Sequence, residues 1–487
     1  MAILVIDVGT SGLRAAIINN DATLGLVCHE EFAPSTPAPG MVEFDAQAMK
    51  QAVLRVARTV AASVSKVEAV GITNQRASTI AWRKSTSEPL GPAIGWQDLR
   101  TVFDCIMTKT NHSVALQPNQ TATKAAWMLN NYVSDAAERA SEDICIGTVD
   151  SWVVSVLTGG VVHATDPSNA AVTGLSNSGG QTWNPDVMNI LGLHTHQFAT
   201  IVPSSGFIGH ATELVGAPPI MSMIGDQQAS LVGQGCISSG KTKITFGTGG
   251  MLDVFIGSQP PERAERSTGG TFPIVAFSTS TEIFYGAEAI MLSAGTNIEW
   301  LRDDMQLVSS AAQTHEVAAT CSTAEGVVYV PALLGLGTPH WDYGARGTLL
   351  GITRGTTRSH IVRAVLEGVA HRGVDLVDAA QVDTGLDITE LRIDGGMSRN
   401  ATFVQALADA SGRKVCVSPV TEATTLGAGF LAGVAAGVWK TLDEPCSAAE
   451  PASVIAPLGN PGVSRQQWAE AISRARSWIP DLSALDF

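Results

Sequence analysis

The chain has 487 residues, of which 45% are hydrophobic, and its 30 basic and 45 acidic residues give a formal net charge of −15. This length and composition allow two large domains with substantial cores, and the acidic balance argues against nucleic acid or a membrane surface as a partner. Seven scattered cysteines without a C-x-x-C pair favour a reducing cytoplasm over a disulfide framework or a zinc site. The first apolar run contains Asp7 and does not resemble a signal peptide, and the apolar run at residues 427–439 is too short to span a membrane.

The N-terminal segment predicts a β-hairpin around a glycine-threonine turn. Two apolar runs, residues 3–8 and 13–18, flank the sequence Gly9-Thr10-Ser11-Gly12. Glycine permits the positive φ of tight turns and lets backbone amides approach an anion closely. We therefore expect a strand, a turn that suits phosphate, and a second strand.

Strands and helices alternate after this hairpin, as in α/β proteins. A third strand is expected around residues 23–32, and Asp45 is expected to cap a helix with one apolar face. Residues 69–73 predict a buried strand that runs into the polar loop 74–76. The apolar helix face consists of Ala46, Met49, Val53, Val56, Val60 and Val64.

The middle of the chain contains an apparent P-loop. Residues 235–242 match G-x-x-x-x-G-K-[ST], but a working P-loop needs a strand before it and a helix after it. Here the order is reversed, because residues 227–234 favour a helix and residues 243–246 favour a strand. We interpret residues 238–241 as an exposed turn; a P-loop NTPase that depends on Lys241 is the alternative.

A second glycine-threonine hairpin follows at once. Strand-like residues 243–246 and 251–256 flank Gly247-Thr248-Gly249-Gly250. Two such hairpins, opening the two halves of a long chain, indicate paired phosphate clamps from a duplicated domain. We expect an N-terminal domain at residues 1–246 and a C-terminal domain at residues 247–487.

The second half repeats the alternation of strands and helices. Ser359 is expected to cap a helix that runs to about residue 382, and residues 391–394 are expected to form a strand. Gly395 and Gly396 then form a turn into a helix from Asn400. Another strand at residues 415–417 and a helix at residues 424–438 complete the pattern.

Two such halves describe the actin-like (ribonuclease H-like) ATPase architecture, an α/β fold with a deep interdomain cleft. Specific motifs in order from Ile3 almost to Trp478 narrow this class. They are Asp7-x-Gly-Thr, Gly71-Ile-Thr-Asn-Gln-Arg76, Trp96-Gln-Asp98, Gly147-Thr-Val-Asp-Ser-Trp152, Gly225-Asp-Gln-Gln228, Phe246-Gly-Thr-Gly249, Asp394-Gly-Gly396 and Thr424-Thr-Leu-Gly-Ala428. Through these motifs the chain resembles the FGGY family of carbohydrate kinases, and within that family it is closest to the glycerol kinases.

The resemblance implies an enzyme that transfers a phosphoryl group from ATP, with Mg²⁺, to an alcohol. Asp226 would be the general base, which must come within hydrogen-bond reach of the acceptor hydroxyl. The two halves would close around the substrates and expel water. Without the resemblance, an Asp in this Gly-Asp-Gln-Gln setting would equally suit the cap of the helix that follows.

The resemblance also implies a nucleotide site, mainly on the C-terminal half. Asp7 would orient the hydrated Mg²⁺, although on its own it is equally well a turn-forming residue. Arg14 would neutralise phosphate or be a solvated strand residue, and the glycines would equally suit helix–strand packing. The positions expected to contact ATP are Gly9, Thr10, Ser11, Arg14, Thr248, Gly249, Gly295, Gly395, Gly396 and Asn400.

The acceptor pocket departs from the glycerol kinase pattern. Arg76, Trp96, Asp226 and Gln227 match it, although Trp96 would also suit a core and Arg76 would also suit a pair with Asp98. Three further substrate positions differ: Ala77 replaces Glu, Asn119 replaces Tyr and Met251 replaces Phe.

The loss of a carboxylate that accepts two hydroxyl hydrogen bonds should cost about 1–3 kcal/mol of glycerol binding. We therefore expect a polyol or open-chain ketose of about four or five carbons in preference to glycerol. A true glycerol kinase and a xylulose or ribulose kinase are the alternatives within the family.

Other classes also remain open. A non-metabolic actin-like or chaperone-like ATPase would share the scaffold but would give no reason for the acceptor residues. A catalytically inactive binding protein is disfavoured because the motif acids are present.

A small polyol or sugar is the expected partner, and a homodimer is compatible with the sequence.

Overall fold

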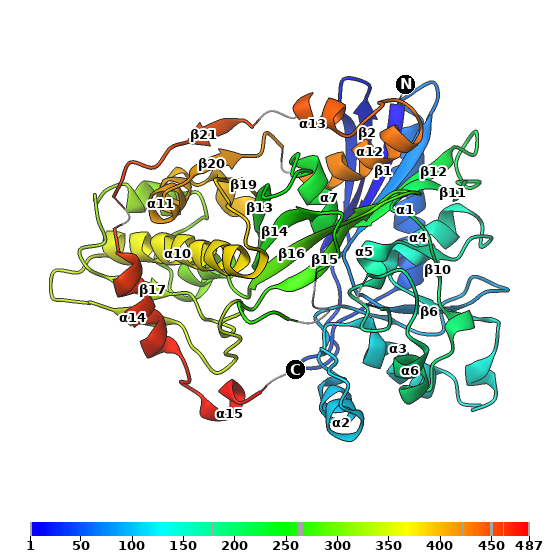
Figure 1. Ribbon diagram of the computed structural model, residues 1–487, viewed down its shortest axis with the longest axis horizontal. Helices are drawn as coiled ribbons and strands as arrows, with labels where there is room; N and C mark the ends of the chain where they lie inside the picture. The colour runs from blue at the N-terminus through cyan, green and yellow to red at the C-terminus, as the bar shows by residue number, and fades with distance from the viewer. Residues whose placement is uncertain are drawn as a thin grey trace.

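The computed structural model describes residues 2–177, 179–261, 266–420, 422–448, 451–460 and 462–485. Two halves, each built on a mixed β-sheet, lie side by side (Figure 1). The N-terminal sheet has the order β11-β12-β5-β1-β2-β3 and the C-terminal sheet the order β15-β16-β14-β13-β19-β20-β21. This is the two-domain α/β fold that the sequence predicts.

The strands of the N-terminal sheet are β1 (Ala2–Val8), β2 (Gly12–Asn19), β3 (Leu24–Glu31), β5 (Ala69–Asn74), β11 (Ser205–His210) and β12 (Pro219–Gly225). The strands of the C-terminal sheet are β13 (Thr242–Phe246), β14 (Gly250–Gly257), β15 (Phe272–Ser278), β16 (Ile283–Met291), β19 (Glu390–Asp394), β20 (Lys414–Val417) and β21 (Ser453–Ile455).

The two sheets repeat one pattern. In each, the opening hairpin (β1–β2 or β13–β14) is antiparallel, and a third antiparallel strand (β3 or β16) continues it. The first strand of each hairpin then pairs in parallel with the next strand inward (β5 or β19), which pairs in parallel with another (β12 or β20). The matching order agrees with the duplication inferred from the two glycine-threonine turns.

The alternation of side chains along β1 separates two cores. Leu4 and Ile6 face α1 (Ala46–Ala61) and α4 (Val149–Leu157) on the outer side of the N-terminal sheet. Ile3 and Val5 face α7 (Asp226–Gly233) and α12 (Ala423–Ala435), which also pack against Phe255 of the C-terminal sheet. Helices α7 and α12 therefore lie between the two sheets, and α12, coloured orange in Figure 1, lies beside the blue strands of the other half.

The outer face of the C-terminal sheet is covered by α10 (Arg358–Thr384) and α11 (Ala401–Ser411). A satellite layer of the N-terminal half contains β6 (Ile80–Arg83), β8 (Ile144–Gly147), α2 (Val102–His112), α3 (Thr121–Tyr132) and α6 (Pro185–Ile190). The remaining short elements are β4 (Glu43–Phe44), β7 (Ala93–Ile94), β9 (Ala164–Thr165), α5 (Pro167–Ala170), β10 (Thr200–Ile201), α8 (Thr296–Glu299), α9 (Gln313–Ala318), β17 (Val328–Val330), β18 (Thr348–Leu350), α13 (Asp443–Ala448), α14 (Arg465–Ala475) and α15 (Pro480–Ser483). Within the described ranges, no helix is long and apolar enough to cross a membrane.

Several local predictions are confirmed. The carboxylate of Asp45 accepts hydrogen bonds from the amides of Gln47 and Ala48 at 2.8 and 3.1 Å and so caps α1. The apparent P-loop is a connection, because Thr242 begins strand β13 and no helix follows it. Lys241 instead forms an ion pair with Glu390 at 2.6 Å.

The start of α10 was predicted wrongly. Thr357, in an extended conformation, precedes the helix and forms its capping box with His360. Ser359 lies inside the first turn, where its hydroxyl is hydrogen-bonded to that of Thr320 at 2.7 Å. A Ser and a Thr two residues apart both suit an N-cap, and the tertiary contact of Ser359 decides between them.

The change from one sheet to the other falls between Gly233, where α7 ends, and Thr242, where β13 begins. A boundary at residues 246/247 would divide the β13–β14 hairpin. We therefore propose that residues 234–241 form the connection between the domains.

Helices α7 and α12 approach each other at two glycines. A Cβ on Gly427 would overlap the carbonyl oxygen of Ala229, and a Cβ on Gly233 would overlap that of Ala423. Hence a side chain at either position would separate the helices.

We expect Gly427→Ala to lower the free energy of unfolding by about 2 kcal/mol or more, because overpacking against backbone cannot be relieved by rotating a side chain. Chemical denaturation followed by circular dichroism measures this change. Gly206→Ala is the matched control, because its Cβ would meet only Pro203 at 3.8 Å. Equal stability of the two variants would contradict the close approach.

Candidate active site

Asp226 lies at the junction of β12 and α7, as the first residue of the helix. Its Oδ1 accepts a hydrogen bond from the amide of Gln227 at 2.8 Å and lies 3.7 Å from Nε of Arg76. The side chain remains 26% exposed, so the carboxylate is accessible to a small molecule. Burial raises the pKa of Asp226 to about 6; Arg76 opposes this shift and Asp7 adds to it.

Arg76 joins the two domains electrostatically. Its Nη2 donates a hydrogen bond to Oε2 of Glu288, on β16 of the C-terminal sheet, at 2.6 Å. Its Nη1 is buried and lacks a hydrogen-bond partner among the described residues. Because a buried unpaired donor is costly, this nitrogen suits the oxygen of a bound acceptor. The alternative pairing with Asp98 is wrong, since that carboxylate binds Arg100 at 2.7 Å.

A buried lysine fixes the orientation of the Gln227 amide. Nζ of Lys243 donates to Oε1 of Gln227 at 2.6 Å and to the hydroxyl of Thr245 at 3.0 Å, and lies 2.8 Å from Oδ2 of Asp253. An ammonium group is only a donor, so it must face the amide oxygen. The amide nitrogen of Gln227 is therefore the end left to contact a ligand.

Met251 shares a sheet face with this charged cluster. It lies two residues before Asp253 on β14, and its cross-strand neighbours are Thr245 and Ile290. Residues two apart on a strand point to the same side. Glu288, opposite Asp253, faces Arg76, so Met251 lies on the face that adjoins Arg76.

Trp96 and Asn119 are held near each other by a buried lysine. Nζ of Lys124 donates to the carbonyl oxygens of Gly95, Trp96 and Asn119 at 2.9, 3.1 and 3.3 Å. Burial lowers the pKa of Lys124 to about 7. Trp96 is 38% exposed and is therefore not a core residue, and its indole donates to the hydroxyl of Thr10 at 3.1 Å in the first glycine-threonine turn.

Ala77 lies in the same region with a positive φ of 63°. Its carbonyl oxygen accepts hydrogen bonds from the hydroxyls of Thr79 and Thr121, both at 3.2 Å. The structure thus brings Arg76, Ala77 and Asp226 together with the segment of Trp96 and Asn119, because α3 anchors both that segment and Ala77.

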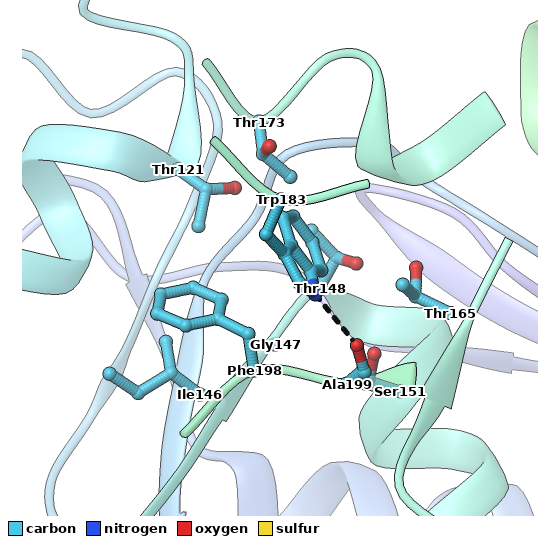
Figure 2. A pocket seen from close by; sticks show the side chains of 10 residues that line it. All are labelled: Thr121, Ile146, Gly147, Thr148, Ser151, Thr165, Thr173, Trp183, Phe198 and Ala199. Atoms are coloured by element: carbon cyan, nitrogen blue, oxygen red, sulfur yellow. Dashed lines mark hydrogen bonds between the residues drawn. The ribbon is translucent and has the colours of Figure 1, made fainter. Parts of the chain in front are cut away.

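A small cavity in the N-terminal half is lined by Thr121, Trp183 and Phe198. Figure 2 shows the rings of Trp183 and Phe198 and several hydroxyl side chains around it, with the Trp183 indole donating to the carbonyl of Ala199 at 2.8 Å. Its volume of about 10 Å³ has room for about one water molecule. The cavity is therefore too small to be an alternative site for a polyol.

Asp7 is the penultimate residue of β1 and contacts the first turn of α12. Its Oδ2 accepts hydrogen bonds from the hydroxyls of Thr424 and Thr425 at 2.8 and 3.1 Å. Burial raises the pKa of Asp7, and Arg14 counteracts this. Arg14 is not a solvated residue, because Nη1 lies 3.2 Å from Glu422 and Nε lies 3.7 Å from Asp7.

Asp7 fits one way of holding Mg²⁺. Oδ1 of Asp7 takes part in no hydrogen bond or ion pair with the residues that the structure describes. The same residues contain no cluster of three His, Cys, Asp or Glu that could form a complete cage. A cation here would therefore share carboxylates with water and phosphate oxygens, which suits Mg²⁺ with a nucleotide.

Two of the predicted nucleotide residues, Gly295 and Gly395, lie against the second glycine-threonine turn. The amide of Gly295 donates to the carbonyl of Gly247 at 2.8 Å, and the amide of Ala294 donates to that of Thr248 at 2.9 Å. Gly395 has a φ of 85° and a Cβ there would overlap the carbonyl of Phe246, whereas a Cβ on Gly396 would meet nothing within 4 Å. These close approaches explain the glycines at 295 and 395. The space beside Gly396, in contrast, is open.

The remaining predicted positions are Gly9, Ser11, Gly249 and Asn400. Gly9 and Gly12 close the first turn through a hydrogen bond of 2.9 Å, with Ser11 exposed between them. Gly249 lies against the carbonyl of Met291, which a Cβ would approach to 2.8 Å. Asn400 caps α11, and its amide nitrogen donates to Thr314 at 2.8 Å, so its side chain is already engaged.

Sequence reasoning missed Glu288, Lys243 and Asp253. All three are charged residues at inward positions of apolar strands, and a buried charge normally requires a partner. That signal was available in the sequence, but the identity of each partner depends on how the two sheets meet.

The Asp226 carboxylate lies beside Arg76 where the two domains meet, and each domain contributes one glycine-threonine turn. This fold and this arrangement of residues define a phosphotransferase of the actin-like class. The N-terminal domain of the FGGY family of carbohydrate kinases matches residues 2–233, and its C-terminal domain matches residues 242–436. The chain belongs to this family, and it is an enzyme that transfers a phosphoryl group to an alcohol group.

Related proteins cover the whole chain. A glycerol kinase from Rhodopirellula baltica is 38% identical over all of this chain and 93% of its own, and one from Deinococcus radiodurans is 37% identical over 99% of both. The crystal structure of Plasmodium falciparum glycerol kinase with ADP is 26% identical, with a TM-score of 0.90 over 97% of this chain and 98% of that one.

The raised pKa of Asp226 predicts the pH dependence of turnover. If Asp226 is the general base, it must be ionised to act, so kcat/KM for the acceptor should fall as the pH drops through about 6. A pH–rate profile from pH 4.5 to 8.5 measures this. Rates that stay constant down to pH 4.5 would contradict the environment described for this carboxylate.

Proposed function

We propose that this protein transfers the γ-phosphoryl group of Mg-ATP to a hydroxyl of a small polyol or open-chain sugar, with Asp226 as the general base. The observation that carries the proposal is the position of Asp226, accessible at a helix N-terminus and 3.7 Å from a buried arginine. Arg76 would hold an acceptor oxygen through Nη1, and Oδ of Asp226 would take the proton of the attacking hydroxyl.

The proposed contacts to the phosphate groups of ATP come from the two glycine-threonine turns. Amides of Gly9 to Ser11 and of Thr248 and Gly249 would hold phosphate oxygens from opposite domains. Asp7 would hold the hydrated Mg²⁺, which supplies positive charge against the phosphates when bound. Trp96 supports this arrangement, since its indole connects the acceptor wall to Thr10. Closure of the domains would exclude water as a competing acceptor.

Replacing the base tests the function. Asp226→Asn should lower kcat by about 100-fold to 10,000-fold with little change in acceptor affinity. The carboxylate has a pKa above its unfolded value, so its ionised form costs stability above pH 6, and the Asn variant should melt no lower than wild type at pH 7.5.

Kinetics in a coupled ADP assay, with calorimetry of acceptor binding and of unfolding, separate these effects. Lys241→Ala is the control, because Lys241 belongs to the connection and pairs with Glu390. Turnover of Asp226→Asn comparable to wild type would remove Asp226 from the role of base.

For the acceptor, we favour a chain of about four or five carbons. The side chain of Ala77 supplies no acceptor for a hydroxyl, and Asn119 and Met251 replace the two aromatic side chains of the glycerol kinase pattern. Glycerol is the second candidate, and the names of the relatives at 37–38% identity support it.

A panel of glycerol, tetritols, pentitols and ketopentoses distinguishes the two. We expect at least one longer substrate to exceed glycerol about tenfold in kcat/KM, since a missing hydrogen-bond partner costs about 1–3 kcal/mol. Ala77→Glu combined with Asn119→Tyr should shift the preference back towards glycerol. Glycerol as the best substrate of the wild type would contradict the expectation.

A further inference from the structure

Asp166 is a fully buried carboxylate that no step of the proposed reaction uses. It precedes the short helix α5 and accepts hydrogen bonds from four donors. The hydroxyl of Ser168 donates to both its oxygens at 2.8 Å, the backbone and side-chain amides of Asn169 each donate at 2.9 Å, and the hydroxyl of Ser204 donates at 2.6 Å. Both oxygens are therefore engaged.

The first connection leads to Asp226. Oγ of Ser168 accepts a hydrogen bond from the amide of Gly225 at 2.9 Å. Gly225 is the residue before Asp226, at the end of β12, and a Cβ there would lie 2.8 Å from Cδ of Arg76. The Asp166–Ser168 pair thus fixes the backbone that carries the carboxylate and supports the arginine.

The second connection leads to the loop of Arg76. Oδ1 of Asn169 accepts a hydrogen bond from Nδ2 of Asn74 at 3.0 Å, and the same Nδ2 donates to the carbonyl of Gln75 at 2.8 Å. Asn74 ends β5, and Gln75 connects it to Arg76. Because Nδ2 of Asn169 donates to Asp166, the orientation of this amide, and hence its acceptor end, is set by the carboxylate.

The third connection crosses to the other domain. Ser204 donates its hydroxyl to Asp166, and its backbone amide donates to Oγ of Ser278 at 3.0 Å. The amide of Ser278 donates in return to Oγ of Ser204 at 3.0 Å. Ser278 ends β15, the edge strand of the C-terminal sheet, so one carboxylate reaches both sides of the domain junction.

We propose that Asp166 is a positioning residue, which through Ser168 and Asn169 sets Asp226 and Arg76 relative to each other and through Ser204 ties them to the C-terminal domain. The inference rests on the proposed role of Asp226. A carboxylate suits this position because both of its oxygens accept hydrogen bonds from the surrounding donors. In an amide, the NH₂ group would instead face donors and could not accept from them. Misplacing a reacting group by about 1 Å can cost about 100-fold in rate.

Ser168 offers a test that keeps Asp166 in place. Ser168→Ala removes the acceptor for the Gly225 amide and should lower kcat about tenfold or more, with KM for ATP within about twofold of wild type. Ser168→Thr restores a hydroxyl and should recover most of the rate. Ser151→Ala is the matched control, since Ser151 is equally buried in the N-terminal domain and its Oγ has no hydrogen-bond partner among the described residues.

Melting temperatures of all variants are measured beside the kinetics. A lower melting temperature of Ser168→Ala with kcat within about twofold of the Ser151→Ala control would overturn the proposal, because the network would then serve the fold alone. Loss of kcat that Ser168→Thr does not recover would also overturn it.

A double-variant cycle separates this proposal from the proposed function. If Ser168 acts through Asp226, Asp226→Asn with Ser168→Ala should be no slower than Asp226→Asn alone. Additive losses would overturn the positioning role while leaving Asp226 as the base. Retained turnover in Asp226→Asn alone would defeat the proposed function, whatever the result for Ser168.

Discussion

Helices α7 and α12 pack so closely at Gly233 and Gly427 that backbone meets backbone between the two sheets. Each helix carries a part of the site at its N-terminus: α7 begins with Asp226, and α12 brings Thr424 and Thr425 to Asp7. The distance between the two carboxylates is thus fixed by how near the helices can lie, and glycine is the residue that permits the shortest approach. The close contact of α7 with α12 therefore governs both the packing of the two sheets and the placement of the two carboxylates.

The charges at the junction follow from this arrangement. Lys243, Asp253 and Glu288 lie on one face of the C-terminal sheet, and Arg76 reaches that face from the N-terminal domain. Buried charges are tolerated when they are paired and hydrogen-bonded. Here the pairs cross the junction, so the electrostatic environment of Asp226 depends on both domains being in contact.

Local features of the fold were predictable from the sequence. The two hairpins, the cap at Asp45 and the turn at residues 238–241 depend on nearby residues, and the structure confirms them. The start of α10 was not, since Thr357 and Ser359, two positions apart, both suit the cap and Ser359 instead contacts the distant Thr320. In the site, motifs indicated Arg76 and Asp226, but the ion pair of Arg76 with Glu288 joins residues 212 positions apart and has no local signal.

The attachment of α12 to the first sheet has a consequence for biosynthesis. Asp7 and its partner Thr424 are 417 residues apart, and the inner face of the N-terminal sheet is covered by a helix that follows almost all of the second domain. Contacts of such long range form late, because the intervening chain must be ordered first. The nascent N-terminal half therefore leaves the ribosome with Ile3 and Val5 not yet covered by α12, and the carboxylate of Asp7 acquires its hydroxyl partners only when the chain is nearly complete.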